Sequence, residues 1–402
     1  MADELQSVEA ALGALLDGVA PLPAETVPCD QTAGRVLAAS VAARLDVPPF
    51  DNSAMDGYAL RAVDAGRVLP ISQRIAAGQP AGPLIAGTCA RIFTGGEIPP
   101  GADCVVMQER VEVREDGIRV PGDIPSGDNV RRRGRDVQAG NELLAAGTRL
   151  EAAALGQLAG QGVTEVEVRR RPRIALLSTG DEVITPGQPL APGQIYNSNR
   201  PMLTRLVERF GGDVVYTAGV PDDFEATCRT LTEAAEIADV VITTGGVSVG
   251  EEDHVKHALE RLGQLDMWRL AMRPGKPLAL GRLPHEGAEA RFIGLPGNPV
   301  SGYVGAWLFL RPLLGELLGC PALKTLPRIR ARSDFATRTQ ARRHYMRVSL
   351  TFDEDGARAH AFADQNSAVL SSCVTANALA VIPAHSELHS GDPVDCLWLV
   401  EA

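Results

Sequence analysis

Between residues 174 and 272, short apolar runs alternate with amphipathic stretches. The runs 174–178, 214–220, 240–243 and 268–272 have the length of strands. The stretches between them, 201–210, 222–238 and 253–262, carry apolar side chains at helical spacing. This alternation predicts an α/β fold with a parallel, doubly wound sheet. Ligands of such sheets bind beyond the carboxyl ends of the strands.

The flanking segments have other patterns. Residues 8–16 have helical apolar spacing after Ser7, a plausible N-cap, and residues 35–41 predict a second short helix. Residues 44–140 alternate short apolar runs with Gly and Pro turns, which predicts a β-rich domain. Residues 325–402 read as a compact β-domain. A chain of 402 residues is therefore expected to hold several domains.

Charge and cysteine usage narrow the class of protein. The net charge of −11 argues against a general nucleic-acid or anionic-membrane partner. The chain has no apolar run of membrane-spanning length and no basic-then-apolar leader at its start, which predicts a cytoplasmic protein. None of the seven cysteines forms a C-x-x-C pair, so neither a zinc cluster nor a disulfide framework is expected.

Glycine-rich or charged loops follow several of the predicted strands. They occupy residues 178–182, 243–253, 273–277 and 296–302. Glycine lets backbone N–H groups approach an anion, and a helix N-terminus adds partial positive charge. Lys276 and Arg273 would neutralise a phosphate or another oxyanion. The alternative is that the Gly-Gly loop is only a turn and the lysine and arginine are solvated charges.

Two acids in these loops predict a metal ion. Glu182 and Asp253 would repel an anion unless a divalent cation lay between them, and oxygen ligands beside phosphate favour magnesium. Residues 181–182 could instead cap a helix. The sequence contains no P-loop, no dinucleotide fingerprint and no nucleophile elbow, so those enzyme classes are disfavoured.

Six motifs together resemble the MoeA/gephyrin E-domain family. They are long, they occur in the order of the family, and they span residues 48–302. The motifs are PPFDNSAMDGYA (48–59), IFTGG (92–96), STGDE (178–182), TGGVSVG (244–250), PGKP (274–277) and LPGNP (295–299).

The resemblance implies an architecture of four subdomains. A linking domain would combine residues 24–43 with 141–169, and a β-rich domain would cover 44–140. The doubly wound, MogA-like domain would comprise 1–23 and 170–320, followed by a C-terminal β-barrel-like domain at 325–402. Members of this family are homodimers, with the active site between the doubly wound domain of one subunit and the β-rich domain of the other.

The implied activity is that of a magnesium-dependent transferase of molybdenum cofactor biosynthesis. It inserts molybdate into adenylyl-molybdopterin, releasing AMP and giving Mo-molybdopterin. By motif position, the catalytic residues would be Asp56, Thr94, Glu182, Asp222 and Lys276. The magnesium ligands would be Glu182, Asp253 and Asp136. Substrate and molybdate would be bound by Gly245, Gly246, Ser248, Arg273, Lys276, Pro296, Asn298, Pro299 and Ser301.

Other readings stay open. Asp56 could be a structural carboxylate of an Asp-Gly turn, and Arg135 stands where the family usually has Glu before Asp136. A molybdopterin adenylyltransferase shares the doubly wound domain, but it would not need residues 24–169 or 325–402; it is also a possible partner protein. A gephyrin-like, non-catalytic scaffold is the second alternative.

Overall fold

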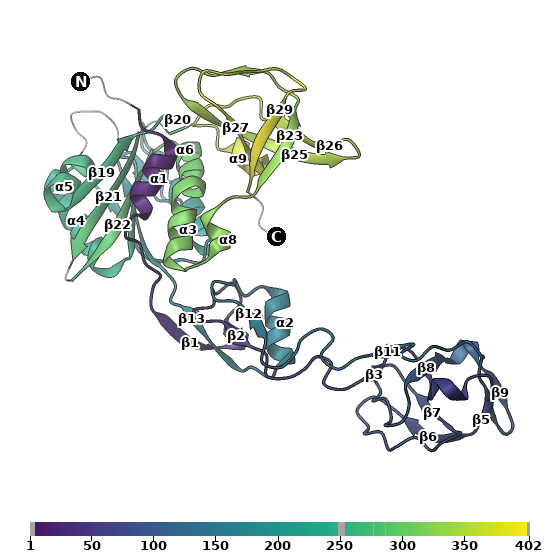
Figure 1. The fold of residues 1–402 in the computed structure, drawn as a ribbon. Helices are drawn as coiled ribbons and strands as arrows, with labels where there is room; N and C mark the ends of the chain where they lie inside the picture. Colours follow the sequence, from purple (N-terminus) through teal and green to yellow (C-terminus); the bar gives the residue numbers. More distant parts are fainter. Residues whose placement is uncertain (1–4, 248–253, 276, 286, 400–402) are drawn as a thin grey trace. The chain divides into compact units, whose positions relative to one another are not determined.

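The computed structural model describes residues 5–247, 254–275, 277–285 and 287–399 (Figure 1). The chain divides into two compact units. Unit 1 comprises Met1–Ala39, Ala146–Ala152 and Glu165–Ala402, and unit 2 comprises Ser40–Ala145 and Ala153–Thr164. Each unit is described by itself.

The central sheet of unit 1 has six strands within the described residues. Its first four strands pair in parallel, and the last two pairings are antiparallel. The predicted strands at 174–178, 214–220 and 240–243 are among the parallel ones. The predicted parallel strand at 268–272 was wrong, because Gln264–Arg269 pairs antiparallel and Met272–Arg273 pairs with the C-terminal sheet. The strands at Pro277–His285 and Ala288–Leu295, which form an antiparallel hairpin, were not predicted. In spatial order the strands are β17 (Asp213–Val220), β14 (Arg173–Thr179), β18 (Val240–Thr244), β22 (Ala288–Leu295), β21 (Pro277–His285) and β19 (Gln264–Arg269).

Alternate residues of the strands face opposite layers of helices (Figure 1). Ile174 and Leu176 of β14 pack in one cluster with α1 (Val8–Leu16) and α3 (Asn199–Arg209). Ala175 and Leu177 belong to a second cluster, which includes side chains of α4 (Phe224–Ile237) and α5 (His254–Leu262). Because both faces are covered, the central strands β14 and β18 are buried along nearly their whole length, whereas the edge strand β17 alternates.

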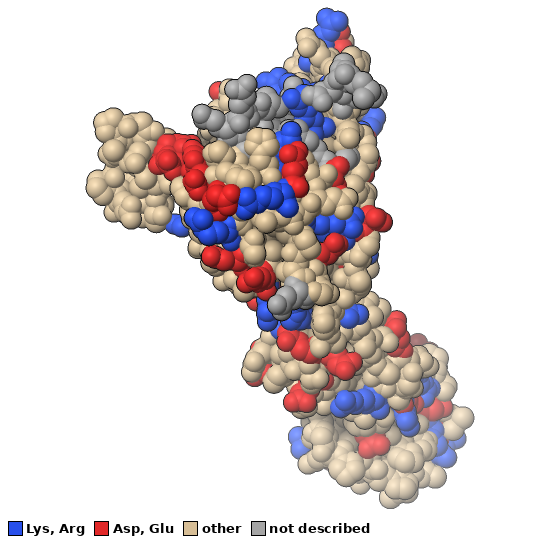
Figure 2. Space-filling view, turned by 90° about the vertical axis from the view of Figure 1, so that its left-hand side faces the viewer, with Lys and Arg blue, Asp and Glu red and all other residues tan. Residues whose placement is uncertain are grey.

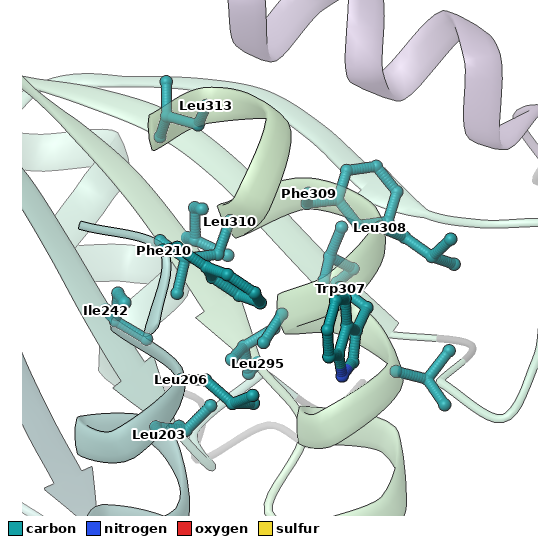
Figure 3. Close-up of a cluster of buried hydrophobic side chains, with 14 of the residues drawn as sticks. Leu203, Leu206, Phe210, Ile242, Leu295, Trp307, Leu308, Phe309, Leu310 and Leu313 are labelled. Carbon is teal, nitrogen blue, oxygen red and sulfur yellow. The ribbon is translucent and has the colours of Figure 1, made fainter. Parts of the chain in front are cut away.

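The larger of these clusters is built around the helix that follows β22. This helix runs through α6 (Pro299–Gly305), a π-helical turn η4 (Ala306–Leu310) and α7 (Arg311–Leu317). Trp307 meets Phe210 edge-on, with ring centroids 4.9 Å apart, among leucines of the sheet and helices (Figure 3). This packing fixes the start of α6, which contributes to the site described below.

The C-terminal strands close into a barrel. The order is β25 (Arg343–Asp353), β26 (Gly356–Ala361), β23 (Arg328–Ser333), β29 (Pro393–Trp398) and β27 (Ala378–Ile382), and β27 pairs back to β25. The short strand β20 (Met272–Arg273) pairs with β25, so the segment that carries Arg273 is attached to the barrel. The predicted C-terminal β-domain is confirmed.

Unit 2 is β-rich, as predicted. A four-stranded sheet holds β6 (Ile71–Ile75), β7 (Cys89–Ile92), β4 (Gly57–Leu60) and β8 (Cys104–Met107), and a second sheet holds β5 (Val68–Leu69), β10 (Gly117–Arg119) and β9 (Glu112–Arg114). The other short elements of the described residues are distributed over both units. They are η1 (Cys29–Gln31), β3 (Asn52–Ser53), η2 (Ala62–Asp64), η3 (Gln108–Arg110), β11 (Val130–Arg131), α2 (Ala152–Gly160), β15 (Val183–Ile184), β16 (Ile195–Tyr196), α8 (Pro321–Lys324), β24 (Thr337–Arg338), α9 (Ser371–Thr375) and β28 (Glu387–Leu388).

The predicted helix at residues 35–41 was wrong. In unit 1, β1 (Ala24–Pro28) pairs with β13 (Glu165–Arg169), and Leu37 bridges to Val168 of the same strand. In unit 2, β2 (Val41–Ala42) pairs with β12 (Glu142–Leu144). The backbone hydrogen bonds of this segment are therefore made to strands more than a hundred residues away, which local spacing cannot reveal.

The surface shows no single-sign charge patch on the face displayed in Figure 2, where basic and acidic side chains are interspersed. Within the described part of the chain, the helices are all too short or too polar to cross a membrane.

Candidate functional site

A cavity of about 600 Å³ opens at the carboxyl ends of the parallel strands. Thr179 ends β14, Thr244 ends β18, and Gly297 follows β22; all three line the cavity. The sequence-predicted residues that the fold brings together here are Glu182, Asp222, Gly245, Gly246, Asn298 and Pro299.

Glycine is required where the strand-end loops turn. A Cβ on Gly180 would lie 2.5 Å from a carboxylate oxygen of Glu182, and one on Gly245 would lie 2.6 Å from the Thr179 hydroxyl. Both glycines have positive φ, which side chains disfavour. The loops can therefore fold tightly over the strand ends and leave room for a ligand.

Two acids line the large cavity. Glu182 is exposed and makes no ion pair or side-chain hydrogen bond within the described residues, whereas Asp222 immediately precedes the α4 N-cap, Asp223. Of the other predicted metal ligands, Asp136 lies in unit 2 and Asp253 lies outside the described residues. No cluster of three potential metal-binding side chains occurs in the part of the chain that the structure describes.

The segment before α3 supplies polar groups that the sequence analysis did not single out. Asn197 donates to the Ser178 hydroxyl over 2.8 Å, and its side-chain oxygen accepts the N–H of Arg200. Asn199 donates to the carbonyl of Gly297 over 2.8 Å, while its own Oδ1 is buried without a partner in the described structure. These bonds tie α3 to two of the strand-end loops. The available signal was the cap-forming sequence Asn-Ser-Asn before a helix.

A second, smaller cavity of about 250 Å³ shares Asn298 with the first. It gathers the predicted residues Arg273, Pro296 and Ser301. It also contains Arg342 and residues 365–367 from the C-terminal domain. Arg342 was not predicted. The family resemblance suggests that residues 364–367 contact the site, but Asn366 stands where the family often has Gly, so the sequence leaves the role of this segment open.

The small cavity is electropositive. Neither Arg273 nor Arg342 has an acidic partner among the residues that the structure describes. Burial lowers the pKa of the neighbouring His344, and the positive charges of Arg273 and Arg342 lower it further. The start of α6 adds the N-terminal end of a long helical segment. Such an arrangement favours an oxyanion.

A buried arginine holds the C-terminal loop against this cavity. The Arg347 guanidinium donates to the carbonyls of Asp364 and Asn366 and to the Ser372 hydroxyl. The carbonyl of Ser367 in turn accepts the N–H of Val300 at the start of α6 over 3.1 Å. The loop therefore satisfies one of the free N–H groups of the helix.

Asp56 and Thr94 meet within unit 2. One carboxylate oxygen of Asp56 accepts both the N–H and the hydroxyl of Thr94, each over 2.8 Å. These hydrogen bonds lower the pKa of Asp56, and the nearby charge of Arg91 lowers it further. The following Gly57 is required, because a Cβ there would lie 1.9 Å from the carbonyl oxygen of Val106.

Three of the predicted site residues, Ser248, Asp253 and Lys276, lie outside the described residues.

Comparisons with known proteins cover nearly the whole chain. Residues 6–162 match the model of the MoeA N-terminal region, residues 175–316 match a probable molybdopterin binding domain, and residues 329–399 match the MoeA C-terminal region. A molybdopterin molybdenumtransferase of Synechococcus elongatus is 38% identical over 97% of this chain and 98% of its own. Another, of Haemophilus influenzae, is 39% identical over 77% of this chain and 78% of its own.

The chain belongs to the MoeA family.

Solved MoeA structures agree with the fold. The molybdopterin biosynthesis MoeA protein of Pyrococcus horikoshii OT3 superposes with a TM-score of 0.82 at 28% identity, covering 98% of this chain and 100% of the other. The residues that line the two cavities fall within the matched family models. The match to the probable molybdopterin binding domain covers the strand-end loops, and the match to the MoeA C-terminal region covers Arg342 and the loop at 365–367.

Proposed function

We propose that this chain inserts molybdate into adenylyl-molybdopterin, releasing AMP and giving Mo-molybdopterin. The observation that carries the proposal is the pair of adjoining cavities. The small one offers two guanidinium groups without acidic partners among the described residues, and the large one is big enough for a nucleotide-like ligand. Sharing Asn298, they would place an oxyanion beside the phosphates of the second substrate.

The small cavity is the proposed molybdate site. Arg273 and Arg342 would bind the dianion through charge-assisted hydrogen bonds, and Ser301 would donate a hydroxyl. Pro296 shapes the wall. Binding of molybdate by Lys276, which lies outside the described residues, stays a prediction. Binding the oxyanion next to the pterin would accelerate the reaction mainly by positioning.

The large cavity is the proposed adenylyl-molybdopterin site, with the backbone of Gly245, Gly246 and Pro299 along its wall. Glu182 and Asp222 offer oxygen ligands of the kind magnesium prefers, and magnesium sites commonly use one or two carboxylates together with substrate phosphates. Magnesium, when bound, would neutralise charge as the phosphoanhydride breaks. Asp253 and Asp136 remain further candidates.

We propose Asp56 and Thr94 as catalytic residues contributed by unit 2. The hydrogen bonds from Thr94 stabilise the ionised form of Asp56 and lower its pKa, so the fixed carboxylate is suited to orienting a water or a substrate group rather than to accepting a proton.

Further parts of the proposal rest on family resemblance. They are the four-subdomain division given above, a homodimer as the working form, a cytoplasmic location and delivery of substrate by the adenylyltransferase. All seven cysteines are free thiols, which fits a reducing compartment.

Turnover of adenylyl-molybdopterin tests the proposal. Purified protein is incubated with this substrate, magnesium and molybdate, and AMP is followed by chromatography. We expect AMP release that needs both ions and falls at least about a hundredfold in Glu182→Gln. AMP release that is independent of molybdate would overturn the proposal.

A further inference from the structure

Two exposed, mainly apolar side chains line the large cavity. Ile195 is 57% exposed and Tyr196 is 46% exposed, and both line the cavity together with Glu182, Asn197 and Asp222. We infer that the phenol ring of Tyr196 is a stacking wall for a planar heteroaromatic ring of the substrate. This inference rests on the proposed function and assigns the ring-binding part of the same site.

The wall is built to keep its position. Ile195 and Tyr196 form β16, which pairs in parallel with β15 (Val183–Ile184), directly after Glu182. The Tyr196 hydroxyl donates to the carbonyl of Gln188 over 2.9 Å. The phenol is therefore tethered at its polar end without being buried.

The chemistry of the pair selects the kind of ligand. The apolar surface of both side chains gains free energy only when something apolar covers it. Phosphate does not cover it, whereas a flat, weakly hydrated heterocycle can stack on the phenol face. The acids and amides around the pair then suit the polar edges and the phosphate end of the same molecule.

Adenine and pterin share this chemistry, so the test must separate them. Isothermal titration calorimetry measures the affinity of the full-length protein, with magnesium present, for AMP, for neopterin and for ribose 5-phosphate, which has no aromatic ring. The variants are Tyr196→Ala, which removes the ring, and Tyr196→Phe, which keeps the ring and loses the tether.

We expect Tyr196→Ala to weaken the ligand that stacks by about 5- to 150-fold, and Tyr196→Phe to stay within about threefold of wild type. If Tyr196→Ala loses affinity for AMP, the wall binds adenine. If it loses affinity for neopterin, the wall binds the pterin. Either result supports the inference. Equal affinities in wild type and Tyr196→Ala for both ring ligands would overturn it. An equal loss of affinity for ribose 5-phosphate in Tyr196→Ala would overturn it too, because Tyr196 would then shape the cavity rather than stack on a ring.

These outcomes are distinct from failure of the proposed function. The titrations contain no molybdate and need no turnover, so a stacking wall can be present in a protein that releases no AMP.

Discussion

Asp56 owes its low proton affinity mainly to Thr94, which donates both hydrogen bonds to one carboxylate oxygen, and to a smaller extent to the charge of Arg91. Replacing Thr94 by Val removes the hydroxyl and keeps the backbone N–H. A carboxylate that loses a hydrogen bond to its charged form has a higher pKa. Thr94→Ser preserves the hydroxyl and is the matched control.

The consequence appears in the pH dependence of AMP release. A carboxylate with a lowered pKa stays ionised, and so active, until the pH falls through that low value. In Thr94→Val we expect the acidic limb of the rate profile to move to higher pH, with little change near pH 8. Thr94→Ser should follow wild type. Superimposable acidic limbs in all three proteins would show that ionisation of Asp56 does not limit the rate.

Single residues were also where the sequence was least informative. Glu182, Gly245 and Asn298 could be assigned to one cavity, because the carboxyl ends of parallel strands meet at one sheet edge. Arg342 and residues 365–367 could not be assigned to the small cavity. They come from the C-terminal domain. The pairing of β20 with β25, the bonds of Arg347 and the bond from the Val300 N–H to the Ser367 carbonyl bring them to α6.

At the scale of elements, Arg347 connects the barrel core to the loop of the small cavity. Arg347→Met would leave the carbonyls of Asp364 and Asn366 without their donor. We expect a loss of stability on the order of 3 kcal/mol and a weaker affinity for molybdate. Arg330→Met is the control, since it breaks an exposed ion pair with Asp395 and should cost less than about 1 kcal/mol. Urea unfolding compares the variants; equal midpoints would contradict the role of Arg347.

Strand β4 sets a second prediction. Gly57→Ala would drive a Cβ into the carbonyl of Val106 on the adjacent strand β8, which we expect to cost roughly 3 kcal/mol or more. Gly122, in the same unit, has open space at its Cβ position, so Gly122→Ala should change stability by less than about 0.5 kcal/mol. Differential scanning calorimetry distinguishes them. A Gly57→Ala protein as stable as Gly122→Ala would mean that β4 and β8 can separate freely.

Elements with strong local patterns were predictable, and elements defined by distant partners were not. Helices α1, α3, α4 and α5 lie where apolar residues recur at helical spacing, and Ser7 caps α1 through the N–H of Ala10. The segment at 35–41 has similar spacing, yet its backbone bonds run to residues 148 and 167–169. The hairpin β21–β22 was not predicted, because no pattern was recognised in the sequence between the loops at 273–277 and 296–302.

At the scale of the whole molecule, the proposed homodimer predicts the mass of two chains. Size-exclusion chromatography with light scattering measures that mass directly. We expect a dimer that persists on dilution to micromolar concentration, because obligate interfaces are large and apolar. A monomer at all concentrations would remove the homodimer from the proposal and leave the cavities of unit 1 unaffected.

The central claim is that the small cavity binds molybdate, and equilibrium titration of molybdate by calorimetry tests it most directly. We expect Arg342→Gln and Arg273→Gln each to weaken binding at least about tenfold, since each removes a charge-assisted hydrogen bond. Arg330→Gln, on the exposed face of β23, should bind as wild type does. Unchanged molybdate affinity in both cavity variants would contradict the account.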